Sequence, residues 1–127
     1  MKRYLPLIIW VVVIIFPSTL IFERAPSGSL INLAYISETA HIITHIIVYA
    51  ILTLLLIPTF KLNLNWTTLG ITLIFALFIG VLQEGLQFIV SADRVFGLPE
   101  IFDLGVNLLG ALLGLALIYL RRSTHKV

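Results

Sequence analysis

Four long apolar runs dominate this sequence and leave few architectures open to it. They cover residues 4–22, 40–57, 66–90 and 101–120. Each is close to the roughly 20 residues that an α-helix needs to cross a hydrocarbon core of about 30 Å. With 60% hydrophobic and 11% charged residues and a mean hydropathy of +1.12, the chain is far from a water-soluble domain. The runs therefore predict four transmembrane helices.

The fold class follows from the chemistry of the backbone in lipid. Hydrocarbon offers no hydrogen-bond partner, so a spanning segment forms either a helix or a strand of a closed barrel. The runs lack the alternation of a membrane barrel. Lys2 and Arg3 resemble the start of a signal peptide, but no small-residue cleavage site follows Phe22, so we interpret the first run as a retained helix. We predict an all-α, four-helix polytopic transmembrane bundle that forms one domain over residues 1–127.

The basic residues predict the orientation of this bundle. Six of the eight Lys and Arg residues fall on one side of the runs: Lys2, Arg3, Lys61, Arg121, Arg122 and Lys126. Because short loops rich in Lys and Arg stay in the cytoplasm, both termini are predicted to be cytoplasmic. The same topology puts Glu100 in an outer loop and all six acidic residues in the outer half. The excess bases are thus membrane anchors and the net charge is only +2, which excludes a nucleic-acid function.

Polar residues interrupt the second, third and fourth runs at helical spacing. Each run carries one pair three or four residues apart: His41 and His45, Glu84 and Gln87, Asp103 and Asn107. Such a pair shares one face of its helix. Counting about 1.5 Å per residue from the outer helix ends places the three pairs at similar depth, with His45, Glu84 and Asn107 in the deeper layer. Because an acid within a span costs up to about 2.5–3.5 kcal/mol without partners or water, we expect the three stripes to line one outer-leaflet pocket.

Each of these residues also has a plainer interpretation. Amides in membrane helices often join neighbouring helices, which is the interpretation we favour for Gln83, one residue off the stripe of its run. Asp103 can complement the positive end of the fourth helix, and Arg94 can anchor at the interface. His41 and His45 have a spacing that, with carboxylates from two other helices, permits a divalent metal. Without the glutamate of the HExxH motif that pattern is weak, so we favour a non-ligating pair and assign no metal and no cofactor.

Small residues in the third and fourth runs predict close packing between helices. Ala76 and Gly80 are four residues apart, as are Gly110 and Gly114. Small residues at this spacing let membrane helices approach closely. We expect them to close the bundle, and a homo-oligomer that forms through Gly110 and Gly114 is the alternative.

The polar residues also occur in a distinctive order: His45-x-x-x-Tyr49, Glu84-x-x-Gln87, Arg94, and Asp103-x-x-x-Asn107-x-x-Gly110. Over residues 38–115 this order resembles the signature of the VanZ-like family of integral membrane proteins. The resemblance implies a multi-pass protein of the bacterial inner (cytoplasmic) membrane, of the type named for resistance to the glycopeptide antibiotic teicoplanin. It further implies that the polar residues act on lipid headgroups or lipid-linked cell-envelope precursors.

Two functions fit the predicted pocket. In the first, an enzyme modifies a phosphate-bearing lipid: His45 is nucleophile or general base, and Glu84 or Asp103 orients it. The predicted substrate contacts are Arg94, Gln87, Asn107, His41 and Tyr49. In the second, the pocket is a non-catalytic membrane binding or scaffold module for an envelope enzyme. A transporter needs a continuous polar path, which the apolar cytoplasmic halves of the runs do not offer.

Overall fold

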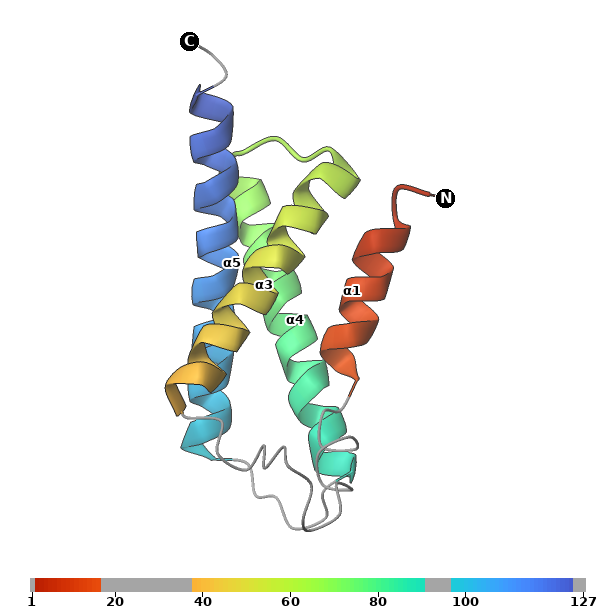
Figure 1. Cartoon of the computed structure of the whole chain (residues 1–127), viewed down its shortest axis with the longest axis vertical. Helices are drawn as coiled ribbons and strands as arrows, with labels where there is room; N and C mark the ends of the chain where they lie inside the picture. The colour runs from red at the N-terminus through yellow and green to blue at the C-terminus, as the bar shows by residue number, and fades with distance from the viewer. Residues whose placement is uncertain (1, 17–37, 91–96, 125–127) are drawn as a thin grey trace.

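The computed structural model describes residues 2–16, 38–90 and 97–124 (Figure 1). Within these ranges every secondary-structure element is a helix, which confirms the all-α part of the predicted fold class. The described helices are α1 (Leu5–Ile15), α3 (Glu38–Phe60), α4 (Trp66–Val90) and α5 (Leu98–Thr124). By length and composition α3, α4 and α5 are each able to cross a membrane. These three helices mark the chain as a membrane protein.

The first predicted span is only partly matched by α1. This helix has 11 residues, or roughly 16 Å at 1.5 Å per residue, against about 30 Å of hydrocarbon. It ends because Phe16 precedes Pro17 and takes the extended backbone (φ −60°, ψ 120°) that a residue before proline favours. Residues 17–22 of the predicted span lie outside the described residues. A topology with four spans therefore stays a prediction.

The second and third predicted runs agree with α3 and α4. The limits of α4 are those predicted, 66–90. In contrast, α3 continues through Pro58 to Phe60, although the proline removes one backbone N–H donor and its ring crowds the preceding turn. The chain then turns at Lys61, whose left-handed backbone (φ 53°) is a common way to end a helix.

The last helix begins earlier than predicted. It starts at Leu98 rather than at residue 101, with Pro99 in its first turn, a position where the missing proline N–H costs nothing. The side chain of Glu100 accepts a hydrogen bond from the backbone N–H of Gly97 at 2.8 Å. The predicted placement of Glu100 in an outer loop was therefore wrong: it is a capping residue of α5.

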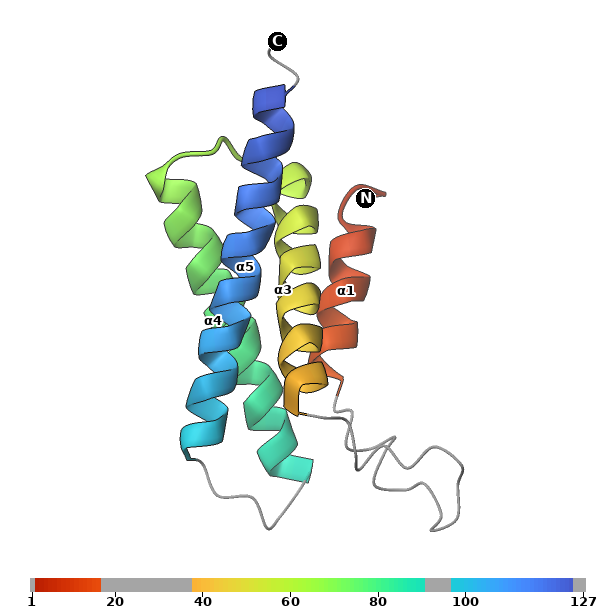
Figure 2. The same cartoon turned by 60° about the vertical axis from the view of Figure 1, so that its left-hand side comes forward.

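The helices are arranged so that α3 and α5 run parallel to each other and α1 and α4 run the opposite way (Figures 1 and 2). α5 packs most extensively on α3 and then on α4, whereas α1 packs on α3 and α4. The start of α1 and the end of α5 lie at one end of the bundle (Figure 1). We call the other end, where α3 and α5 start and α4 ends, the polar end. Which side of the membrane it faces stays a prediction from the basic residues.

Two glycines set the distance between α3 and α5. A β-carbon added at Gly110 would lie 2.5 Å from the carbonyl oxygen of Ile46, and one added at Gly114 would lie 2.7 Å from that of Ala50. Both distances are too short for any side chain, so the two backbones touch, as small residues allow in membrane helices. The expected closure of the bundle is confirmed, and a homo-oligomer through these glycines stays a prediction. We call these contacts the glycine seam.

A smaller apolar contact holds α1 on α3. Leu7 and Ile14 of α1 belong to a buried cluster that includes Leu52 of α3. In addition, the indole N–H of Trp10 donates a hydrogen bond to the carbonyl oxygen of Val48 at 3.0 Å. Many of the remaining large apolar side chains point outward, which in a spanning bundle is the surface that lipid covers.

Candidate functional site

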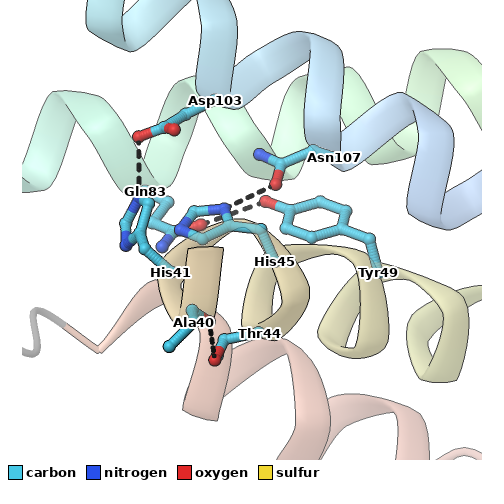
Figure 3. A network of polar contacts seen from close by, with 8 residues as sticks. All are labelled: Ala40, His41, Thr44, His45, Tyr49, Gln83, Asp103 and Asn107. Carbon is cyan, nitrogen blue, oxygen red and sulfur yellow. Dashed lines mark hydrogen bonds and ion pairs between the residues drawn. The ribbon is translucent and has the colours of Figure 1, made fainter. Parts of the chain in front are cut away.

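Two hydrogen bonds join α3 to α5 at the polar end (Figure 3). Nε2 of His41 lies 3.2 Å from Oδ2 of Asp103, and Nδ1 of His45 lies 2.7 Å from Oδ1 of Asn107. In both pairs the partners are 62 residues apart in the chain. The two bonds are thus successive rungs of a ladder, one helical turn apart. They confirm that the stripes predicted on α3 and α5 face each other in two layers.

The glycine seam explains why these particular residues meet. Because α3 and α5 are parallel, one fixed contact sets the register of every turn along the pair. Gly110 rests on the backbone of Ile46, the residue after His45, and also faces Tyr49. One turn before Gly110 on α5 comes Asn107, which brings that residue level with His45. The register of the rungs therefore follows from backbone contact deeper in the bundle.

The hydrogen bond between His45 and Asn107, the deeper of the two rungs, determines which nitrogen of the His45 ring carries the hydrogen. The Oδ1 atom of Asn107 can only accept a hydrogen bond, so Nδ1 of His45 carries the hydrogen. In the neutral ring the lone pair is then on Nε2. Figure 3 shows this second ring nitrogen turned away from Asn107 and towards His41, whose ring centre lies 4.4 Å from that of His45. His45 thus presents a basic nitrogen to the other rung, the pair formed by His41 and Asp103.

Asn107 is held in place without any solvent contact. Its side chain is fully buried, and its Nδ2 atom has no hydrogen-bond partner among the described residues. A β-carbon added at Gly80 would lie 3.0 Å from this nitrogen, so α4 closes over the amide. A buried N–H group without a partner costs about 1–3 kcal/mol. Asn107 is therefore a costly residue for stability, and its evident role is to hold the ring of His45.

Beneath the ladder, a second pair joins α3 to α4. The hydroxyl of Tyr49 donates a hydrogen bond to Oε1 of Gln83 at 3.1 Å (Figure 3). This contact confirms the interpretation of Gln83 as a link between helices. Tyr49 is fully buried, so its position suits support of the site, and its predicted contact with a substrate stays a prediction.

A pocket of about 490 Å³ opens beside the ladder. It is lined by five of the predicted site residues: His41, His45, Glu84, Gln87 and Asp103. Glu84 and Gln87, from α4, are almost completely buried. The three polar stripes therefore do meet in one pocket, as predicted. Imidazole nitrogen and carboxylate oxygen at this spacing can move protons or ligate a metal ion.

The rest of the described pocket wall was missed by the sequence analysis. It is apolar and consists of Ile42, Leu98, Pro99 and Phe102. Three of these residues come from the first turns of α5, which the sequence prediction began too late. In a chain this hydrophobic, an apolar residue does not stand out as part of a site. The signal that could have found Ile42 and Phe102 is that they are the sequence neighbours of His41 and Asp103.

The plainer interpretation of Asp103 is not supported. Since α5 begins at Leu98, Asp103 lies in the second turn, and its carboxylate is engaged by His41. The first-turn acid that complements the positive end of this helix is Glu100. Asp103 is thus a pocket residue rather than a dipole partner.

Arg94, the predicted phosphate ligand, lies outside the described residues. Comparison with known proteins found no matching family model, no matching curated sequence and no matching solved structure. The resemblance to VanZ-like proteins therefore stays a prediction from the order of the polar residues, and the candidate site rests on its own geometry.

Proposed function

We propose that this membrane protein binds a phosphate-bearing lipid or lipid-linked cell-envelope precursor in the pocket at the polar end and modifies its headgroup. The observation that carries this proposal is the mixed wall of the pocket. Histidine, carboxylate and amide groups line it together with the apolar side chains of Ile42, Leu98 and Phe102. A volume of about 490 Å³ lies within the roughly 300–1,000 Å³ of small-molecule sites. A molecule that is polar at one end and apolar at the other matches such a wall.

The proposed chemistry centres on His45. Because Asn107 fixes the hydrogen on Nδ1, Nε2 is available as a general base or nucleophile. Asp103 holds His41 beside it, and Glu84 supplies a second carboxylate to the pocket. Gln87 offers an amide that can donate to a phosphate oxygen, and the predicted phosphate contact of Arg94 adds charge. The polar end faces the outer leaflet in this proposal.

The experiment compares lipids in cells that carry no protein, wild type, His45→Ala or Gln87→Leu. Tyr119→Phe is the control, since Tyr119 is exposed near the far end of α5. Each protein is extracted with its surrounding lipid, and both the co-purified and the total lipids are analysed by mass spectrometry. We expect wild type and Tyr119→Phe to enrich a phosphate-bearing lipid and to change the headgroup profile of the cells. His45→Ala should abolish the change in profile, and Gln87→Leu should lower the enrichment.

The outcomes separate the two candidate functions. Enrichment without any change in headgroup profile supports the non-catalytic binding module. Equal lipid content in wild type and both pocket variants refutes a lipid-directed function altogether. The resemblance to VanZ-like proteins adds teicoplanin susceptibility of the same strains as a further measurement, in which wild type should protect more than His45→Ala.

A further inference from the structure

We propose that His41, His45 and Asp103 bind a divalent transition-metal ion of the zinc type. The ligand atoms that these residues offer all lie within 4.8 Å of one another. Two imidazoles and one carboxylate form a ligand set that zinc accepts at sites that keep an open position for water or substrate. The site itself needs no assumption about a lipid.

The distances are close to those that a bound ion requires. Zinc–ligand bonds of about 2.0–2.1 Å in a tetrahedron put neighbouring ligand atoms about 3.3–3.4 Å apart. Nε2 of His41 and Oδ2 of Asp103 are already 3.2 Å apart. The longest separation in the group has to shorten by at most about 1.4 Å. Small side-chain rotations achieve this, since His41 is half exposed and Asp103 is only partly buried.

The two helices hold the ligands in a suitable arrangement. His41 and His45 are one turn apart on α3, the spacing that places two zinc-binding imidazoles on one helical face. Asp103 comes from α5, which the glycine seam fixes against α3. Ligands on rigid helices keep their geometry better than ligands on loops.

Asn107 provides independent support for this site. A histidine that ligates a metal nearly always donates its other ring N–H to a carbonyl or carboxylate group. His45 does so, to Oδ1 of Asn107 at 2.7 Å. Asn107 is fully buried, and its own Nδ2 has no partner among the described residues. An amide held there at such a cost is accounted for if its carbonyl orients a ligand.

The charge of the ligand group points the same way. The carboxylate of Asp103 contributes a negative charge beside the two imidazoles, which favours a cation among them. If the proposed function holds, the ion would take the lone pair on Nε2 of His45, so a water on the ion rather than the imidazole would act as the base. The ion would also give a lipid phosphate a positive partner, and this role of the metal rests on that function.

The test measures Zn²⁺ binding to the purified full-length protein in detergent, with an affinity tag that contains no histidine. After removal of metal with a chelator, Zn²⁺ is titrated against a coloured competitor. We expect one ion per chain, and affinities lowered at least about tenfold by His41→Ala, His45→Ala and Asp103→Asn. His125→Ala is the matched control, because His125 is the only other histidine of the chain. This variant should bind Zn²⁺ with the same affinity as wild type.

Two further measurements keep the test decisive if ligand variants fold poorly. Zn²⁺ should raise the unfolding temperature of wild type, and a chelator should reverse the rise. Co²⁺ should give wild type a ligand-field absorption spectrum that Asn107→Leu alters, with Zn²⁺ affinity lowered about 10–100-fold, the usual effect of losing an outer partner. The metal site is refuted if wild type shows neither the rise in unfolding temperature nor the Co²⁺ spectrum. It is also refuted if folded ligand variants bind Zn²⁺ as tightly as His125→Ala.

These results are independent of the lipid experiment. Gln87→Leu leaves the three ligands intact and should bind Zn²⁺ as wild type does, while losing lipid enrichment. Absence of Zn²⁺ binding together with a normal lipid result refutes the metal site alone. Zn²⁺ binding without any lipid effect refutes the proposed function alone.

Discussion

Gly110→Ala should destabilise the protein, although alanine is the better helix former. The added β-carbon would lie 2.5 Å from the carbonyl oxygen of Ile46, 3.0 Å from its Cα atom and 3.0 Å from Cβ of Tyr49. The first two are backbone atoms of α3, which cannot rotate out of the way. To bring the shortest distance to the 3.0–3.4 Å of a tight contact, α5 has to move away from α3.

The expected magnitude combines two opposing contributions. Overpacking costs about 1–3 kcal/mol, and contact with fixed backbone atoms puts this site in the upper half of that range. Alanine recovers about 1 kcal/mol through its higher helix propensity. We therefore expect a net loss of about 1–2 kcal/mol in the free energy of unfolding.

Gly105→Ala is the matched control in the same helix. A β-carbon at Gly105 meets nothing within 4 Å, so this variant should gain up to about 1 kcal/mol. Both variants are unfolded in one detergent and followed by helical circular dichroism. The same substitution, five positions apart, should move the unfolding free energy in opposite directions. A Gly110→Ala protein as stable as Gly105→Ala would show that α3 and α5 do not touch here, and backbone contact would then not set the register of the ladder.

Two other contacts give simpler predictions. Tyr49→Phe removes the hydrogen bond to Gln83 and should cost about 0.6–2 kcal/mol of unfolding free energy. In a double-mutant cycle, Gln83→Leu should then add less to Tyr49→Phe than it costs alone, whereas fully additive losses would mean that the bond contributes nothing. Trp10→Phe removes the bond to Val48 that holds α1, and it should speed amide hydrogen exchange in α1 while α5 is unchanged. Equal acceleration in both helices would contradict a local role for Trp10.

The sequence was sufficient to predict which polar residues share a helical face, and counting depth from the outer helix ends placed His45 level with Asn107. It did not contain the contact that sets this register. Helical periodicity alone puts His41 with His45 and Asp103 with Asn107. A shift of one turn, about 5.4 Å, satisfies the same periodicity and pairs His45 with Asp103 instead. What distinguishes the two registers is the contact of Gly110 with Ile46, a packing event that no spacing rule contains.

Helix limits were predictable only where the residues that end a helix are themselves informative. Prediction and structure agree at both ends of α4. At the start of α5 the polar Glu100 resembled a loop residue, although its carboxylate satisfies the N–H of Gly97 and so helps to begin the helix. The first run was predicted to continue to residue 22, whereas the effect of Pro17 on the backbone of Phe16 is sufficient to end α1.

The metal pattern was weak in the sequence because its third ligand is remote. A search along one helix finds His41 and His45 without the expected glutamate, since the carboxylate comes from α5, 62 residues after His41. One feature of the polar end is unfavourable for a protein that needs only to be stable: the buried amide nitrogen of Asn107 has no partner among the described residues. An apolar side chain of similar volume would remove that cost. A cation held by His41, His45 and Asp103 accounts for it, because the ion requires the ring orientation that the Asn107 carbonyl provides.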